Sequence, residues 1–495
     1  MNTPLIGLFA YLLLMTVVGI WTWGKNRTKE DFILGDRRLG AWVISFSERT
    51  AAESAWLILG LSGAFFSVGM VEIWTVISCV TGIILSWYII AKKLREISEQ
   101  YGAITLPEYF FKFCGQYGQA VRLISMVIIT FFFAFYVSAQ FLGAGKILEV
   151  TFNLKSSFGM PLAATIVVIY TMMGGFLAVC YTDVIQAILM IFTLLLMPVI
   201  GLVFIATHNL DIGAALAASG GAASLLGGKT GWAGVAALIG GLSWGFGYMG
   251  QPHLVTKFMA INKPEAIKTA RRVATAWTIL AYSGAALIGI IGLTMVYYGV
   301  IPTDGLAGQG GDPERILPVI AGFLFPAWLA GILVVGAIAA MMSTADSQLL
   351  VTSSTIVEDF YSKALGRKPT QKSLVAMSRV ITVLVGIAAF ALASSSHKLI
   401  YDVVSMAWSG LGSSFGPALV LSLHWKRMTG AGVVAAMLTG AISTVLWVSI
   451  PNLDATISVR FVSFALATAA GIIGSYASKR TEEQKILGAS PDSSV

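Results

Sequence analysis

Apolar runs of about 20 residues recur along this chain and restrict its fold more than any other feature. A helix of that length crosses the roughly 30 Å hydrocarbon core of a bilayer. Thirteen such runs are predicted, near residues 4–23, 41–66, 72–91, 121–148, 158–180, 184–206, 231–256, 273–299, 323–352, 379–394, 400–423, 430–450 and 459–478. Only 11% of the residues are charged, whereas soluble domains carry about 25%. The pattern predicts an all-α, multi-pass protein of the inner (plasma) membrane with about 13 transmembrane helices.

Lysine and arginine are concentrated in alternate loops between these runs. The basic loops lie near 24–40, 92–120, 257–272 and 358–379. Loops 207–230 and 300–322 contain few such residues. Because basic loops stay in the cytoplasm, the N-terminus is predicted outside the cell and the C-terminus inside. The net charge of +8 is explained by these loops, so no nucleic-acid partner is predicted.

Two of the runs, 41–66 and 231–256, are interrupted by small and polar residues. They lie five predicted helices apart. Because five is an odd number, a block of five helices that starts at 41–66 runs in the opposite direction to a block that starts at 231–256. This arrangement predicts inverted repeats at about 41–206 and 231–423.

Residues 1–480 are predicted to form a single transporter domain, with a cytoplasmic tail at 481–495. The first helix at 4–23 and the extra helices at 430–478 lie outside the two repeats. The sequence contains no GxxxxGK[ST] phosphate-binding loop, so a pump driven directly by ATP is not expected.

Three charged residues, Glu48, Arg49 and Glu53, lie within the apolar run 41–69. One charge at the membrane centre costs roughly 2.5–3.5 kcal/mol. Small residues surround the three, so this helix can pack closely and open locally, with free carbonyls facing a cavity. The pattern predicts an ion site. The alternative for Glu48 and Arg49 is a position at the membrane interface.

Two other segments place polar groups at depth. Ser343 and Ser347 share one helix face, with Asp346 beside them, and hydroxyl oxygens suit an alkali cation. The alternative is that these hydroxyls bond the carbonyl one turn earlier. Asp183 follows a pair of glycines and opens the next predicted helix, where a carboxylate also serves as a helix cap.

An aromatic pair marks the second interrupted run. Trp244 and Tyr248 share a face among glycines, and Pro252 breaks the helix one turn later. Aromatic walls beside free backbone groups suit a small amphipathic solute. An aromatic anchor at the membrane interface is the alternative.

Six stretches in this order carry a resemblance to a known family. They are ILGDRRLG (33–40), TLPEYF (105–110), GGFLAVCYTDVIQA (174–187), WGFGYMGQPH (244–253), MSTADSQLLVTSS (342–354) and AWSGLGSSFGP (407–417). From about residue 4 to 478 the chain resembles the sodium/solute symporter family, and within it the bacterial sodium/proline symporters. The resemblance implies an APC/LeuT-like core of two inverted five-helix repeats. Solute and sodium would bind midway along the predicted helices 41–66, 121–148, 231–256 and 323–352, between them.

The resemblance also implies roles for particular residues. The main sodium site would use Thr50, Glu53, Ala340, Ser343 and Thr344, the first two through their backbone. Asp183 matches a carboxylate associated with sodium passage. The positions associated with solute are Ser54, Tyr136, Trp244, Tyr248 and Pro252. Arg37 matches a loop residue associated with coupling.

The chain departs from the proline branch at three positions. Ala52 stands where an aspartate is expected, with Glu53 one place further on, which is a turn of about 100° around a helix. Arg49 replaces a glycine, and Asp346 replaces a serine. Because the predicted helices 41–66 and 323–352 run in opposite directions across the membrane, Arg49 and Asp346 are predicted to form an ion pair that acts as an inner gate.

The leading hypothesis is a secondary active transporter in which a sodium gradient drives uptake of proline or a related amino acid by alternating access. No bond is made or broken, so the protein is not predicted to be an enzyme. Its partners would be the solute, sodium and the lipid bilayer, with sodium as the coupling ion and no cofactor. The oligomeric state stays open, a monomer included. The alternatives are a proton-coupled or organic-anion symporter of the same fold, with Glu53 as proton carrier, and a solute sensor that does not transport.

Overall fold

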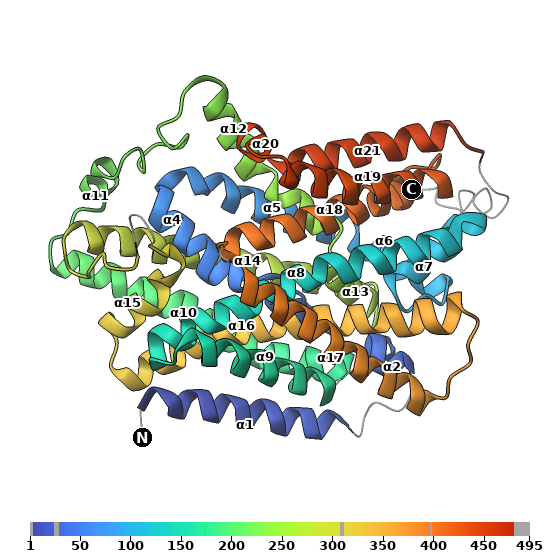
Figure 1. Ribbon diagram of the computed structural model, residues 1–495, viewed down its shortest axis with the longest axis horizontal. Helices are drawn as coiled ribbons and strands as arrows, with labels where there is room; N and C mark the ends of the chain where they lie inside the picture. The colour runs from blue at the N-terminus through green and yellow to red at the C-terminus, as the bar shows by residue number, and fades with distance from the viewer. Residues whose placement is uncertain (1–2, 24–28, 174, 307–310, 397, 480–495) are drawn as a thin grey trace.

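The computed structural model describes residues 3–23, 29–173, 175–306, 311–396 and 398–479, and every named element in these ranges is a helix (Figure 1). Most helices lie along one long axis, with their connections gathered at the two ends (Figure 1). The all-α class predicted from the apolar runs is confirmed for the described residues.

The helices of the first half of the chain are α1 (Thr3–Trp23), α2 (Lys29–Leu34), η1 (Gly35–Arg37), α3 (Ala41–Ala52), η2 (Trp56–Leu61), α4 (Ser62–Val68), η3 (Gly69–Glu72), α5 (Ile73–Ile89), α6 (Ala91–Gln100), α7 (Leu106–Cys114), η4 (Gly115–Tyr117), α8 (Gly118–Phe152), α9 (Ser156–Met173), α10 (Phe176–Thr207) and α11 (Ile212–Ala218). Those of the second half are α12 (Gly231–Leu242), η5 (Trp244–Met249), α13 (Pro252–Met259), α14 (Ala266–Tyr297), η6 (Pro313–Arg315), α15 (Ile316–Leu324), α16 (Ala327–Ser354), η7 (Thr355–Ala364), α17 (Gln371–Ser395), α18 (Ile400–His424), α19 (Gly430–Ser449), α20 (Leu453–Thr456) and α21 (Val459–Tyr476).

Among the described residues, nine helical segments are long and apolar enough to cross a membrane. Two shorter apolar helices cover Ile6–Thr22 and Ser157–Met172. The predicted runs 41–66 and 231–256 are the two that break into several short helices. The number of 13 spans, the placement of the termini and the division into inverted repeats and one domain with a tail stay predictions.

The first break separates α3 from the π-helical turn η2. Glu53 follows the end of α3 with φ −98° and ψ 66°, outside helical geometry, and Ser54 is not helical either. The side chain of Gln140 on α8 accepts the free backbone N–H of Ala55 at 3.0 Å. A buried amide left free by the broken helix is therefore satisfied from a neighbouring helix, as a membrane interior requires.

The second break separates η5 from α13. Gly250 and Gln251 are not helical, and Pro252 starts α13, where its missing N–H costs nothing. A side chain at Gly247 would collide with the Trp408 ring, so glycine allows α18 to pack against η5. The sequence therefore encodes both breaks, one through small polar residues and the other through glycine and proline.

The basic loops collect at one end of the molecule. Helices α2, α6 and α7, which lie within or border loops 24–40 and 92–120, appear at the right of Figure 1. Helices α11 and α15, from the loops with few basic residues, appear at the left. The alternation of loops predicted from charge therefore matches the two ends of the helix bundle.

Candidate ion and solute site

Four of the predicted ion residues come together where α3, α10 and α16 meet. The Thr344 hydroxyl on α16 donates to the backbone oxygen of Ala51 at 3.0 Å, and Ser343 donates to the Asp183 carboxylate on α10. Thr50 lies 3.3 Å from the backbone oxygen of Asp183. Ser343 and Thr344 therefore reach across to other helices, and the alternative that they bond within their own helix is not what the structure has. Ala340, one turn before Thr344, is fully buried.

Asp183 lies well inside α10 and does not cap it. The helix begins at Phe176 and its N-cap is Gly175, so Asp183 is two turns from the end. Its carboxylate accepts hydrogen bonds from Ser47 and Ser343, on α3 and α16. The alternative in which Asp183 caps the following helix is wrong, because α10 begins at Phe176.

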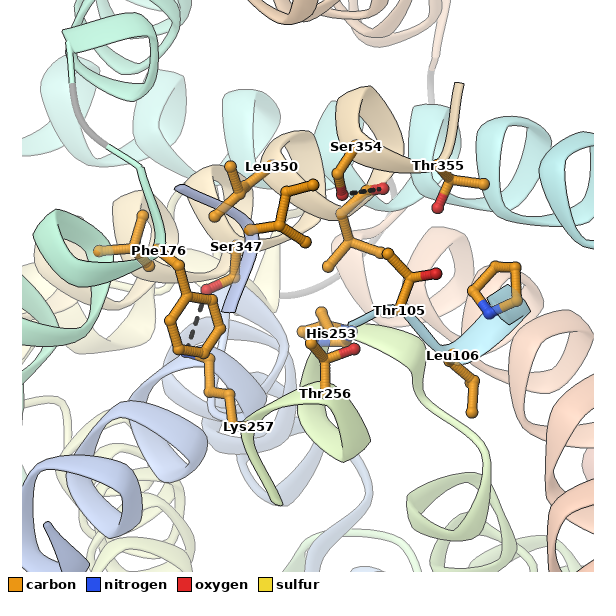
Figure 2. A pocket seen from close by; sticks show the side chains of 14 residues that line it. Thr105, Leu106, Phe176, His253, Thr256, Lys257, Ser347, Leu350, Ser354 and Thr355 are labelled. Atoms are coloured by element: carbon orange, nitrogen blue, oxygen red, sulfur yellow. Dashed lines mark hydrogen bonds between the residues drawn. The ribbon is translucent and has the colours of Figure 1, made fainter. Parts of the chain in front are cut away.

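Lys257 is a buried cation of the candidate site that the sequence did not predict. It was assigned to the basic loop 257–272, but it lies in α13 and is 1% exposed. Its Nζ atom contacts the Asp183 carboxylate at 2.8 Å, the Ser47 hydroxyl at 2.8 Å, the Ser47 backbone oxygen at 2.9 Å and the Ser347 hydroxyl at 3.1 Å. Figure 2 shows the hydrogen bond between Lys257 and Ser347. The signal in the sequence was a lysine within the otherwise mostly apolar helix PHLVTKFM. We call Lys257, Asp183, Ser47, Ser343 and Ser347 the bridge cluster.

Asp346 is fully buried beside this cluster, and among the described residues no side chain donates a hydrogen bond to its carboxylate oxygens. It interacts electrostatically with Asp183, which repels it, and with Lys257, which attracts it. The predicted ion pair between Arg49 and Asp346 is not formed. Arg49 instead binds Glu48, its neighbour on α3.

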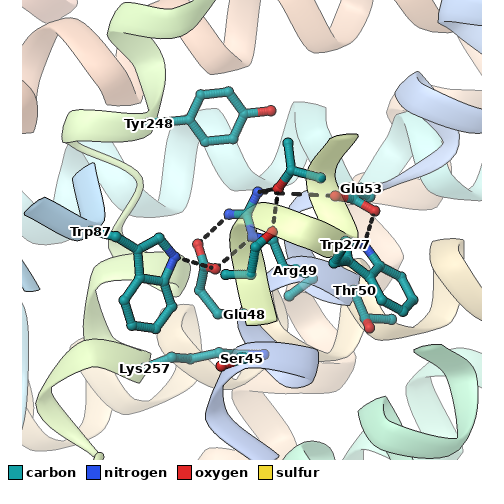
Figure 3. A network of polar contacts seen from close by, with 12 residues as sticks. Ser45, Glu48, Arg49, Thr50, Glu53, Trp87, Tyr248, Lys257 and Trp277 are labelled. Atoms are coloured by element: carbon teal, nitrogen blue, oxygen red, sulfur yellow. Dashed lines mark hydrogen bonds and ion pairs between the residues drawn. The ribbon is translucent and has the colours of Figure 1, made fainter. Parts of the chain in front are cut away.

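A second set of charges lies on the other side of α3. Arg49 Nε donates to Glu48 at 2.6 Å, and a second nitrogen of the guanidinium also contacts that carboxylate. Arg49 lies 3.9 Å from Glu53, and Figure 3 shows its guanidinium between the two carboxylates. Indole nitrogens of Trp87 on α5 and Trp277 on α14 donate to Glu48 and Glu53 respectively. We call these five residues the bundle cluster.

The bundle cluster shows the surroundings of the charges in run 41–69. Glu48 is 2% exposed and Arg49 is 0% exposed, so both side chains are buried within the protein, and their depth in the membrane stays a prediction. The Glu53 carboxylate contacts Arg49 and Trp277, on α3 and α14. Its side chain is therefore engaged inside the bundle cluster, and only its backbone stands at the helix break.

The predicted solute residues line one aromatic region between the two breaks. Ser54 lies 3.3 Å from the Tyr136 hydroxyl on α8. Rings of Trp56 and Trp244 have centroids 4.3 Å apart and join the first break to the second. Tyr248 packs edge-on against Trp408 at 4.7 Å. Ser54, Tyr136, Trp244 and Tyr248 are thus linked by short contacts, and Pro252 starts the helix beyond them.

Three aromatic residues of this region were not predicted. Trp408 on α18 donates its indole N–H to the Trp244 backbone oxygen at 3.1 Å. The Tyr401 hydroxyl accepts from Trp244 Nε1 at 3.1 Å, and Trp56 packs at a tilt against the Trp244 ring. Trp408 lies within the motif AWSGLGSSFGP, so that motif was the available signal.

Arg37 lies at the end of the molecule that carries the basic loops. It donates to the backbone oxygens of Met259 and Ala103 and to the Ser98 hydroxyl, at 2.5, 2.8 and 3.1 Å. Burial and the nearby Arg95 lower the pKa of Arg37 to about 10. Since Met259 ends α13, Arg37 holds the same short helix that carries Lys257.

Solved structures share this fold. A sodium-coupled sialic acid symporter in a substrate-bound outward-open state aligns with a TM-score of 0.79 and 18% identity, over 97% of this chain and 99% of the other. Mhp1, a nucleobase-cation-symport-1 family transporter in a closed conformation, aligns with a TM-score of 0.53 and 12% identity, over 92% and 97% of the two chains. Two interrupted helices that meet beside buried oxygens and aromatic rings are typical of ion-coupled secondary transporters.

Sequence comparison identifies the family. The profile of the sodium:solute symporter family matches residues 32–440. The sodium/proline symporter of Escherichia coli (strain K12) is 36% identical over 90% of this chain and 88% of its own. The osmoregulated proline transporter OpuE of Bacillus subtilis (strain 168) is 34% identical over 96% and 95%. The chain therefore belongs to the sodium:solute symporter family, and the resemblance noted in its motifs is confirmed.

Proposed function

We propose that this protein is a symporter of the plasma membrane that uses a sodium gradient to take up proline or a closely related amino acid. The observation that carries the proposal is the contact of the Thr344 hydroxyl on α16 with the last turn of α3, beside the aromatic region at the second break. The relatives named for proline transport cover nearly the whole chain at 34–36% identity.

The proposed sodium site lies between α3 and α16. Sodium would take its oxygens from the backbone of Thr50, Glu53 and Ala340 and from the hydroxyls of Ser343 and Thr344. Support comes from the Thr344 contact with Ala51, which holds the two helices at hydrogen-bond distance. Hydroxyl and carbonyl oxygens replace part of a cation's hydration shell and still allow its release. Asp183 would attract sodium electrostatically.

The proposed solute site is the aromatic region between the two breaks. Tyr136, Trp244, Tyr248 and Trp408 offer apolar surface for a pyrrolidine ring, while Ser54 and the free backbone groups of the breaks offer polar contacts. A zwitterion needs both kinds of contact, because its ring is apolar and its two charged groups require hydrogen bonds. Tyr401 and Trp56 would close the site on one side.

The proposed mechanism is alternating access. Helices α3–α4, α5, α12–α13 and α14 would rock against α8, α10, α16 and α17, with the end carrying α2, α6 and α7 in the cytoplasm. Support for this sidedness is the charge of the loops, because basic loops stay inside the cell. Sodium bound between α3 and α16 would stabilise one arrangement and so favour solute binding.

The test is uptake of labelled proline into proteoliposomes under an inward sodium gradient, an inward proton gradient or neither. We expect accumulation with the sodium gradient alone. Ser343→Ala is expected to raise the sodium concentration that gives half-maximal uptake. Ser394→Ala, an exposed serine that bonds only its own helix, serves as the matched control. Uptake driven by protons alone would overturn sodium coupling, and absence of proline uptake would overturn the solute.

A further inference from the structure

The surroundings of Lys257 have the composition of a cation site. Four oxygen atoms surround Nζ at 2.8–3.1 Å: one from the Asp183 carboxylate, one backbone carbonyl and two serine hydroxyls. An ammonium group has three protons to donate. The four acceptor oxygens therefore outnumber the three N–H donors. The arrangement resembles the oxygen shell around a bound cation more than a set of hydrogen bonds with one donor for each acceptor.

The charge of this region depends on the lysine. Asp183 and Asp346 are both fully buried, and Lys257 is the cation that contacts one of them directly. Within the part of the chain that the structure describes, no side chain donates a hydrogen bond to either oxygen of Asp346. Without the ammonium, the electrostatic repulsion between the two buried carboxylates would be uncompensated in a low dielectric, which is costly unless a cation enters.

The ammonium also joins parts of the protein that move apart in the proposed mechanism. Lys257 and Ser47 belong to α13 and α3, whereas Asp183 and Ser347 belong to α10 and α16. A free cation in this position could leave to the cytoplasm when the helices separate. A lysine side chain stays attached to α13.

We propose that the Lys257 ammonium is a built-in cation that occupies a second alkali-ion position next to the proposed sodium site. The protein would therefore bind one sodium ion fewer than a variant in which this side chain is neutral. This inference rests on the proposed function, since it concerns how many ions that transporter takes up.

The experiment counts bound sodium in the purified full-length protein by scintillation proximity with radioactive sodium. Lys257→Met has similar length and no charge, and we expect it to bind one more sodium ion per chain than the natural protein. Its melting temperature should also rise more steeply with sodium concentration, because an ion that binds only the folded state stabilises it. Lys268→Met is the matched control: Lys268 is exposed near the start of α14, so the count should not change.

A second pair of variants keeps the test decisive if Lys257→Met does not fold. Asp346→Asn combined with Lys257→Met leaves the net charge of the region as it is in the natural protein. This double variant should bind one more sodium ion than Asp346→Asn alone. Equal counts within both pairs would overturn the inference. A natural protein that binds no sodium would overturn sodium coupling, whereas a new ion in Lys257→Met would still support the role of the lysine.

Discussion

The bundle cluster and the bridge cluster lie on two sides of the same helix and differ in what they connect. Ser47 and Glu48 are neighbours in α3, yet one contacts Asp183 and Lys257 and the other contacts Arg49 and Trp87. Consecutive residues in a helix are turned by about 100°, so adjacent side chains serve different surroundings.

The difference concerns motion. The bundle cluster is built from α3, α5 and α14, which move together in the proposed mechanism, so its ion pair persists through the transport cycle. The bridge cluster joins α3 and α13 to α10 and α16, so its contacts have to break and reform. The first cluster is therefore expected to govern stability, and the second to govern ion binding and transport.

Replacing Arg49 gives the largest expected effect and tests the stabilising role of the bundle cluster. Arg49→Met leaves the buried carboxylates of Glu48 and Glu53 without their cation. Removing one partner of a buried pair costs about 3–5 kcal/mol. We expect a large fall in melting temperature and in the yield of monodisperse protein. Arg272→Met, at an exposed position, should leave both unchanged. An Arg49→Met protein as stable as the natural one would break the comparison.

Replacing Asp183 should affect ion use more than stability. Asp183→Asn keeps the shape and the contacts of the side chain but removes its charge. Hydrogen bonds to charged groups contribute about 1.5–3 kcal/mol, so the sodium concentration for half-maximal uptake should rise roughly tenfold or more. The measurement is proline uptake against sodium concentration. Asp304→Asn, in an exposed loop, is the control. Unaltered sodium dependence would remove Asp183 from the ion path.

A substitution of Trp408 tests the proposed solute site independently of both charged clusters. Trp408→Ala removes ring contacts to Tyr248 and Tyr136, each worth about 0.5–1.5 kcal/mol beyond simple burial. We expect the KM for proline to rise several-fold, to about tenfold, with little change in sodium dependence. Trp328→Ala, at an exposed position of α16, should change neither. A parallel loss of sodium affinity would show that the two sites are not separable.

The smallest expected effect is at Arg37, which holds the end of α13. Arg37→Lys keeps the charge but cannot reach the Met259 and Ala103 oxygens together, and a lost hydrogen bond costs about 1 kcal/mol. We expect a fall of a few degrees in melting temperature and a modest loss of uptake rate. The control is Arg38→Lys, whose side chain is mostly exposed. If Arg37→Lys changed uptake as strongly as Asp183→Asn, Arg37 would act together with the bridge cluster in ion binding and transport.

Much of the site was predictable because it rests on local features. The breaks near Glu53 and Pro252 follow from small residues, glycine and proline, which act on the backbone where they stand. Ser343, Thr344, Asp183, Tyr136, Trp244 and Tyr248 were found from motifs, and the structure places them at the meeting points of helices. Their transport roles stay proposals.

The incorrect predictions all concern which residues a given side chain contacts. Lys257 was assigned to a loop because it begins a basic stretch, Arg49 was paired with Asp346, and Asp183 was considered a helix cap. Which residue a side chain meets depends on how far each helix extends and how it is rotated toward its neighbours.

The sequence by itself determined that this chain forms membrane-spanning helices, where two of them break, and to which family it belongs. Hydropathy, charge and motifs depend only on residues that are close together in the sequence. Only the tertiary structure decided that Lys257 lies in an oxygen shell between Ser47, Asp183 and Ser347, and that Arg49 binds Glu48. These residues are up to 300 positions apart along the chain, and the packing of α3, α10, α13 and α16 alone brings the oxygens of the shell to one point.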